Sequence, residues 1–224
     1  MPDFLDTGPG ETGWTLLLAH GAGAGMETAF LERVTELISE RGVRVVRFEF
    51  GYMAARRANG KRRPAPKAET LMPEYRLAVE EVHRSAPIGR LAIGGKSMGG
   101  RVASLVADEL NGSAQISALV CLGYPFHPPG MPEKTRTEHL ASLACPALIV
   151  QGERDPFGSR GEVGGYSLDP RIEIAWISDG DHDFGPRGAS GFTRKGNLAV
   201  AADAVVAFLR RLDRHPAAAG QNEP

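Results

Sequence analysis

The sequence has no marked excess of charge, no long apolar run and almost no cysteine. Its 224 residues contain 26 Lys and Arg against 27 Asp and Glu, which gives a formal net charge of −1. General nucleic-acid and membrane-surface binders normally carry a strong basic excess, so we expect neither kind of partner. No apolar stretch approaches the roughly 20 residues that cross a bilayer. The N-terminal residues lack the basic and apolar parts of a secretory signal.

Only two cysteines are present, Cys121 and Cys145, and both lie in or beside strand-like segments. Their spacing matches no metal-ligand pattern, so the sequence predicts no metal site from them. We interpret them as buried, reduced thiols of a cytoplasmic protein.

Apolar runs of strand length alternate with segments of helical periodicity along most of the chain. The expected strands are residues 14–19, 43–48, 91–94, 116–122, 147–151 and 172–177. The expected helices are residues 26–39, a segment that opens at Pro73, 98–110 and 197–212. Strands that are apolar on both faces belong in a parallel sheet with helices on both sides. The sequence therefore predicts the α/β class, as a three-layer, doubly wound sheet of about six mostly parallel strands.

The length suits one domain, which we place at residues 1–214. Residues 215–224 are rich in Pro, Ala and Gly and are predicted to be a disordered tail. The longest connections, 49–70 and 123–146, are too short to form a separate cap domain.

Residues 95–99 read Gly-Lys-Ser-Met-Gly, a G-x-S-x-G motif centred on Ser97. Because the serine follows a strand and opens a helix, the context is that of a strained turn that exposes a nucleophile. The alternative is an ordinary Gly/Ser-rich turn. A phosphate-binding loop would need glycine at position 90, which is Arg90.

A serine nucleophile needs a base and a carboxylate that orients the base. His182 is the histidine that follows a late strand, and Asp155 lies a few residues beyond the strand before it. We predict Ser97, Asp155 and His182 as the catalytic residues, with Glu153 as the alternative acid. His20 is the alternative histidine, although it is better suited to stabilising its own turn.

The glycine-rich turn at residues 20–25 follows the first strand and places small residues where backbone amides can face a substrate. We expect the amides of Ala22, or alternatively Gly23, and of Met98 to form an oxyanion hole. The dinucleotide-binding pattern fails because its third glycine would fall on Met26 or Thr28.

The order of four motifs resembles the α/β-hydrolase superfamily over residues 14–212. These motifs are His20-Gly21-x-Gly23, the Ser97 motif, Gly152-x-x-Asp155-Pro156 and Gly180-Asp181-His182. The segments 47–50, 52–53, 60–64 and 121–126 resemble a small, capless, dienelactone-hydrolase-like subfamily of predicted hydrolases. That subfamily is similar to the hydrolase-like region of a chromatin-complex regulatory subunit. The resemblance implies a hydrolase fold without a cap, and it implies that the leading antiparallel hairpin is missing or vestigial.

The expected function is a cofactor-independent serine hydrolase that cleaves an ester, thioester or lactone of a small substrate through an acyl-enzyme on Ser97. The alternative is a hydrolase-fold protein with a non-catalytic binding or assembly role. The basic segment 49–70 is either a solvated loop or a lid that attracts an anionic substrate. Five residues are candidates for substrate contact: Gly23, Tyr52, Arg62, Arg63 and Tyr124. The oligomeric state stays open.

Overall fold

The computed structural model describes residues 3–9, 13–60, 64–85 and 89–214. Within these residues one sheet runs through the molecule, in the order β1-β3-β2-β4-β5-β6-β7. The strands are β1 (Phe4–Thr7), β2 (Trp14–Ala19), β3 (Arg44–Phe48), β4 (Arg90–Lys96), β5 (Ala118–Leu122), β6 (Ala147–Gly152) and β7 (Ile172–Ile177). Strands β2 to β7 pair in parallel. The predicted fold class is confirmed, and each strand expected from the sequence is present.

Strand β1 adds a seventh strand to the six that were expected, and it is what remains of the leading antiparallel hairpin that was expected to be missing or vestigial. It pairs antiparallel with β3, so that Phe4 lies opposite Phe48 and Thr7 opposite Val45. This strand is short and only partly buried, and its Asp6 is exposed and paired with Arg44. An edge strand of this kind lacks the continuous apolar run that revealed the others.

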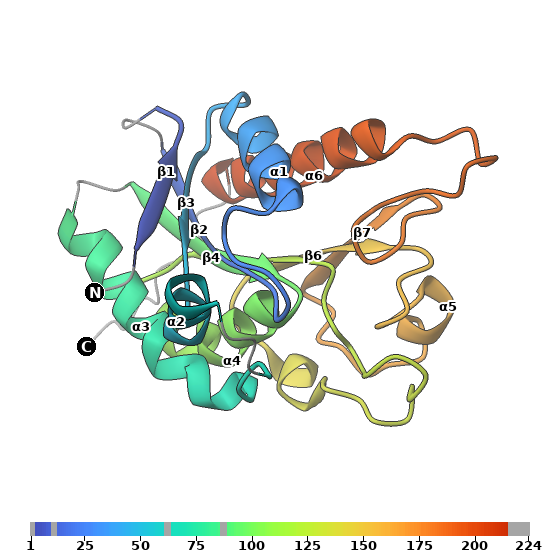
Figure 1. Cartoon of the computed structure of the whole chain (residues 1–224), viewed down its shortest axis with the longest axis horizontal. Coiled ribbons are helices and arrows are strands. Elements are labelled where there is room, and N and C mark those ends of the chain that lie inside the picture. Colours follow the sequence, from blue (N-terminus) through green and yellow to red (C-terminus); the bar gives the residue numbers. More distant parts are fainter. Residues whose placement is uncertain (1–2, 10–12, 61–63, 86–88, 215–224) are drawn as a thin grey trace, which may run out of the picture.

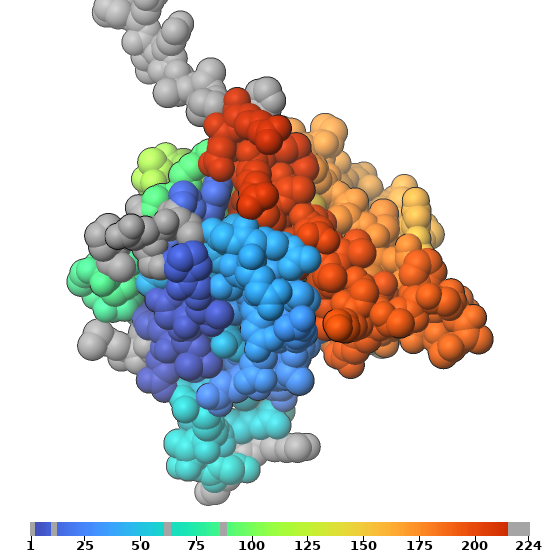
Figure 2. Space-filling model, turned by 90° about the horizontal axis from the view of Figure 1, so that it is seen from above, coloured from blue at the N-terminus to red at the C-terminus, as the bar shows by residue number. Residues whose placement is uncertain are grey.

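Helices cover both faces of the sheet (Figure 1). The helices are α1 (Ala29–Ser39), α2 (Gly51–Asn59), α3 (Ala68–Ser85), α4 (Met98–Gly112), α5 (Arg160–Val163) and α6 (Arg194–Arg214). Helices α1 and α6 lie side by side on one face (Figure 2), where Arg41 donates to Asp203 over 2.6 Å. Helices α3 and α4 pack together on the opposite face, and Arg76 is paired with Glu109 across them over 2.6 Å.

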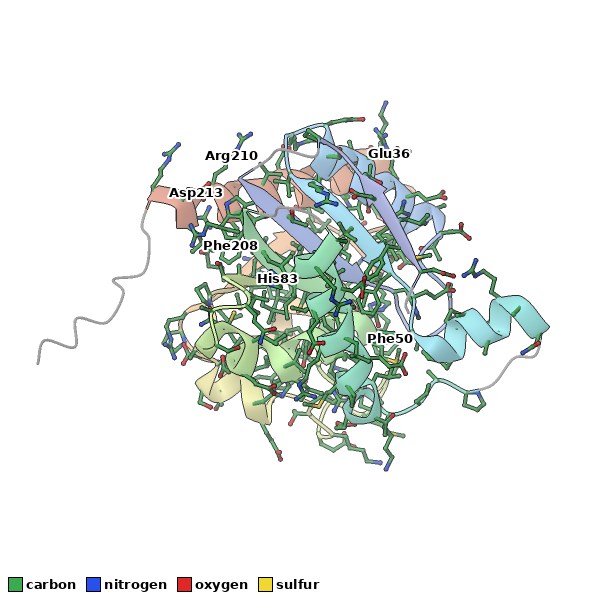
Figure 3. The ribbon with its side chains drawn as sticks, turned by 90° about the vertical axis from the view of Figure 1, so that its left-hand side faces the viewer. Glu36, Phe50, His83, Phe208, Arg210 and Asp213 are labelled. Atoms are coloured by element: carbon green, nitrogen blue, oxygen red, sulfur yellow. The ribbon has the colours of Figure 1, made fainter. Side chains whose placement is uncertain are left out.

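The core forms as two apolar clusters, one on each face of the sheet. Successive residues of β2 alternate between them: Leu17 and Ala19 belong to the cluster beneath α3 and α4, whereas Leu16 and Leu18 belong to the cluster beneath α1 and α6. In Figure 3, Phe208 of α6 lies on the sheet side of the helix layer, whereas Glu36 of α1 and Arg210 of α6 lie on its outer side. Burial of both faces explains the apolar runs of the sequence.

One expected helix boundary and one expected connection were wrong. Pro73 lies inside α3, which begins at Ala68, because Ala68 and Leu71 continue the buried stripe of Tyr75 and Val79. The burial of this extra turn outweighs the backbone hydrogen bond that proline cannot donate. The segment 49–70 is also not one loop, since it contains α2 and the start of α3.

The order of the strands fixes where a site can form. The chain goes from β2 outward to β3, and then crosses back to β4 on the other side of β2. Loops that leave the carboxyl ends of β2 and β4 therefore diverge, and a crevice opens between them. The tail predicted at 215–224 lies outside the described residues. No helix in the described ranges is long and apolar enough to cross a membrane.

Candidate active site

Ser97 occupies the sharp turn between β4 and α4, with a left-handed φ of 52° and ψ of −117°. Its amide donates to the carbonyl oxygen of Leu122 over 3.0 Å, which fixes the turn to the neighbouring strand. A Cβ on Gly95 would lie 2.6 Å from the Ala19 oxygen, and one on Gly99 would lie 2.5 Å from the His20 oxygen. Both flanking glycines are therefore required sterically, and the serine is held in a backbone conformation that side chains rarely adopt.

His182 and Asp155 form a hydrogen-bonded pair at the ends of β7 and β6. Nδ1 of His182 lies 2.8 Å from Oδ2 of Asp155, whose side chain is fully buried. The carboxylate also accepts from the Gln151 amide at 3.0 Å and from the Phe157 backbone at 2.9 Å. An acceptor in this position places the histidine proton on Nδ1 and leaves Nε2 free to act as a base.

The other carboxylates near His182 serve the local backbone. Asp181 accepts from the amides of Asp183 and Gly185, as a turn residue does. Asp179 has φ of 51° and is paired with Arg187, which lowers its pKa to about 2. Glu153, the alternative acid, accepts from the amide of Asp179. The carboxylate that reaches His182 is therefore Asp155.

The glycine-rich turn after β2 is held by side chains of the turn itself and of α2. Nε2 of the buried His20 accepts from the Phe50 amide at 3.1 Å, so the Nδ1 proton is donated to the Gly21 oxygen at 2.7 Å. Burial lowers the pKa of His20 and favours this neutral form. The hydroxyl of Tyr52 donates to the Ala22 oxygen over 3.2 Å. His20 thus stabilises the turn, as predicted, and does not take the place of His182.

Ala22 and Met98 are the residues whose amides were predicted to form the oxyanion hole. Both residues line a cavity that contains Ser97. Among the turn, loop and cap hydrogen bonds of the described residues, neither amide is a donor. Met98 is the first residue of α4, and the first amides of a helix have no partner within it.

Two cavities meet at Ser97, and they share Ala22, Ser97 and Phe157 in their walls. The first, which we call the histidine-side cavity, has a volume of about 330 Å³ and also contains Lys96, His182 and Asp183. The second, the arginine-side cavity, has a volume of about 480 Å³. Its other lining residues are Ala65, Pro66, Lys67, Ala68, Glu69, Met98, Arg101, Pro125 and Arg136.

The histidine-side cavity contains groups that sequence reasoning did not assign. The ring of Phe157 packs on His182 with centroids 4.4 Å apart, which restricts rotation of the imidazole. Lys96, inside the serine motif, is buried, and its Nζ lies 3.2 Å from Asp183. Burial lowers the pKa of Lys96, and the negative charge of Asp183 opposes that shift. The sequence could have indicated this buried cation, because Lys96 lies inside the motif that contains Ser97.

Of the three described residues that were expected to contact substrate, one lines a cavity at Ser97 and two do not. Gly23 lines the histidine-side cavity. Tyr52 lines neither cavity, because its hydroxyl binds the turn carbonyls. Tyr124 is fully buried, with its hydroxyl donating to the Arg136 oxygen at 3.2 Å. Direct substrate contact by these two tyrosines is therefore not supported by their positions.

The basic segment also differs from a lid made of free cations. Arg56 donates to the Gly23 oxygen at 2.8 Å, and Arg57 is paired with Asp3 and Glu49. Helix α2 thus supports the glycine-rich turn. Arg62 and Arg63 lie outside the described residues.

Cys121 and Cys145 are buried free thiols, as predicted. Within the described ranges, no group of three or more His, Cys, Asp or Glu side chains is arranged to hold a metal ion.

A search of curated proteins found no match. Solved structures that are similar include the dienelactone hydrolase of Anabaena variabilis, with a TM-score of 0.71, 18% identity and coverage of 93% of this chain and 90% of that one. A serine hydrolase without a lid from Xanthomonas campestris has a TM-score of 0.68 at 18% identity, covering 94% of this chain and 88% of the other. A thermophilic esterase from Thermogutta terrifontis has a TM-score of 0.66 at 17% identity, covering 94% and 93%.

Identities this low show a shared fold alone. The family is shown by the match of residues 12–210 to a model of the alpha/beta hydrolase domain. The chain therefore belongs to the alpha/beta hydrolase family.

Proposed function

We propose that the protein is a serine hydrolase that cleaves an ester, thioester or lactone bond of a small substrate through an acyl-enzyme on Ser97. One observation carries the proposal. Ser97, strained at the end of β4, faces the same cavity as His182, whose far nitrogen is bound by the buried Asp155. A nucleophile, a base and an orienting carboxylate in this relation are the parts that acyl transfer needs.

In the first step, Oγ of Ser97 attacks the carbonyl carbon while Nε2 of His182 takes the hydroxyl proton. Asp155 holds the imidazole through Nδ1 and stabilises the cation that forms. The amides of Ala22 and Met98 stabilise the negative charge on the carbonyl oxygen, and each such donor is worth about 3 kcal/mol.

His182 then donates its proton to the leaving group as the bond to the acyl carbon breaks. A water molecule, activated by the same histidine, attacks the acyl-enzyme and releases the acid. Every proton transfer in this cycle uses groups of the chain or water, and the proposal includes no cofactor.

Labelling with a fluorophosphonate probe, followed by a panel of small esters, thioesters and lactones, tests the proposal. The unmodified protein should be labelled and should turn over at least one substrate class, whereas the Ser97→Ala and His182→Ala variants should do neither. A folded protein that is not labelled and hydrolyses nothing would support the non-catalytic binding role instead. The Lys134→Gln variant, changed on the exposed part of the 123–146 connection, serves as a matched control.

A further inference from the structure

Ser97 lies where the two cavities meet, and the chemistry of acyl transfer distinguishes their roles. The histidine that removes the serine proton must later protonate the leaving atom. The leaving group must therefore depart on the side of His182, which lines the histidine-side cavity. His182 does not line the arginine-side cavity, whereas the oxyanion donor Met98 does. The acyl group consequently extends into the arginine-side cavity.

The two cavities differ in charge. In the histidine-side cavity the ammonium group of Lys96 is neutralised by Asp183, and Phe30 and Leu31 form apolar walls. The arginine-side cavity contains three cations against one carboxylate: Lys67, Arg101 and Arg136 against Glu69. The cavity that receives the acyl group is therefore the electropositive one.

Two of these cations have unused donors. Arg101 is paired with Glu69, but its buried Nε has no hydrogen-bond partner. The guanidinium group of Arg136 makes no hydrogen bond or ion pair with any residue that the structure describes. Burial and the neighbouring Arg101 lower the pKa of Arg136, and the charge of Glu69 opposes that shift only in part, so one carboxylate faces the two cations.

The cations are held in place by the same elements as the nucleophile. Arg101 lies one helical turn beyond Ser97, and its amide donates to the Ser97 oxygen at 3.0 Å. Both backbone polar groups of Arg136 are hydrogen-bonded. Its amide donates to the Phe126 oxygen at 2.7 Å, and its carbonyl oxygen accepts from the hydroxyl of the buried Tyr124. The backbone positions that carry both arginines are therefore held relative to Ser97, as a specificity site requires.

We propose that the arginine-side cavity binds a free carboxylate at the far end of the acyl group, so that the substrates are monoesters of short dicarboxylic acids. The proposal rests on the proposed serine hydrolase function. Arg136 donates two hydrogen bonds to the carboxylate, and the unused Nε of Arg101 donates a further one. The leaving group is a neutral, apolar alcohol in the histidine-side cavity.

The reaction is a hydrolysis that needs water alone. Ser97 forms the bond to the ester carbon, the bond between that carbon and the alcohol oxygen breaks, and His182 gives the alcohol its proton. Water then releases the dicarboxylic acid. The free carboxylate of the substrate is unchanged throughout.

Two ester pairs test the proposal. In the first pair the acyl group differs: 4-nitrophenyl hydrogen glutarate is compared with the neutral 4-nitrophenyl valerate. In the second pair the charge is on the leaving group: 4-acetoxybenzoate is compared with its methyl ester. The unmodified protein should favour the glutarate monoester in kcat/KM and should show no preference for 4-acetoxybenzoate.

The Arg136→Gln variant should lower the glutarate-to-valerate ratio by about 10- to 100-fold, as expected for a lost charged hydrogen bond. Arg136→Lys should recover part of the ratio. Lys134→Gln removes the same charge two residues away, on an exposed side chain outside both cavities, and should leave the ratio unchanged. Melting temperatures check that the variants fold.

The outcomes distinguish a failure of the carboxylate-site proposal from a failure of the proposed serine hydrolase function. Hydrolysis of valerate that depends on Ser97, without a preference for glutarate, would overturn the carboxylate site and leave the hydrolase assignment in place. A ratio that is unaffected by Arg136→Gln, or a preference that follows the carboxylate on the leaving group, would also overturn it. Absence of both fluorophosphonate labelling and ester hydrolysis would overturn the two proposals together.

Discussion

The ammonium nitrogen of Lys96 lies 3.2 Å from a carboxylate oxygen of Asp183, the residue that follows His182. The lysine side chain is 8% exposed and the aspartate side chain 53% exposed, so one partner is buried and the other is solvated. The same nitrogen lies 5.3 Å from the centroid of the Phe30 ring. A buried cation beside the histidine of the candidate site therefore has one solvated partner, and its burial should cost stability.

Replacement of Lys96 by Met should stabilise the protein at neutral pH, because it removes an ammonium group whose charged form burial disfavours. Burial lowers the pKa of Lys96 in the folded state below its ordinary value of 10.5. Between the two pKa values the unfolded chain binds more protons than the folded one, so the unmodified protein gains stability as the pH rises through this window. The difference in stability between Lys96→Met and the unmodified protein should therefore become smaller as the pH rises toward 10.5.

Melting temperatures of both proteins across the alkaline range measure this effect. Lys134→Met, a change at an exposed lysine, should show no pH-dependent difference from the unmodified protein. If Lys96→Met were less stable at neutral pH, the ion pair with Asp183 would outweigh the burial of the charge.

Replacement of Ser97 by Ala should abolish esterase activity and leave the melting temperature within a few degrees. The loss of a triad nucleophile lowers kcat by about 10⁴-fold or more. The serine side chain is not part of the core, so the stability effect should be small. Steady-state kinetics and calorimetry measure the two effects, and full activity in the alanine variant would exclude the proposed nucleophile.

Replacement of Asp155 by Asn should lower kcat by about 10³- to 10⁴-fold, because an amide beside Nδ1 favours the wrong imidazole tautomer. Asp181→Asn is the matched control, since Asp181 accepts from two turn amides and does not contact the imidazole. Asp181→Asn should lower the melting temperature, because it weakens the turn, and should leave kcat close to that of the unmodified protein. A larger kinetic loss for Asp181→Asn than for Asp155→Asn would show that the carboxylate is wrongly assigned.

The parts of the fold that the sequence predicted are those in which burial leaves a pattern. Strands that are buried on both faces appear in the sequence as continuous apolar runs, and the motif that contains Ser97 directly follows one of them. The partly buried edge strand at Phe4–Thr7 has no such run. Asp155 and His182 could be placed because they follow strands whose ends meet at one edge of the sheet.

The groups that surround the candidate site were harder to predict, because tertiary contacts decide their roles. Arg136 lies in an irregular connection, and no pattern in the sequence brings it near Ser97. The basic composition of residues 49–70 indicated a solvated loop or a lid. In the structure Arg56 instead donates to the Gly23 oxygen from a helix.

Replacement of Tyr52 by Phe should lower kcat by about 10-fold with little effect on KM, because the hydroxyl fixes carbonyls of the turn that carries the Ala22 amide. The stability cost should be about 1 kcal/mol, as for one neutral hydrogen bond. Tyr166→Phe is the matched control, since that hydroxyl donates to the Pro132 oxygen away from both cavities. It should leave kcat unchanged. An equal fall in kcat for both variants would contradict a specific role for the turn.

Two glycines of α4 provide a paired test of the turn around Ser97. A Cβ on Gly99 would lie 2.5 Å from the His20 oxygen and 2.6 Å from the Ala19 oxygen, whereas one on Gly112 would meet nothing within 4 Å. The atoms that face Gly99 belong to the backbone of β2 and its turn, so no side-chain rotation relieves the contact. Gly99→Ala should therefore cost about 1–3 kcal/mol of stability and should lower kcat by displacing the turn that holds Ala22.

Gly112→Ala should stabilise the protein by about 0.5–1 kcal/mol, because alanine restricts the unfolded chain and favours the helix. Its kcat should match that of the unmodified protein. Chemical denaturation gives the two free energies of unfolding, and kinetics on one neutral ester gives the two rates. If Gly99→Ala kept both full stability and full activity, the close packing of α4 against the glycine-rich turn could not be what positions the oxyanion donors.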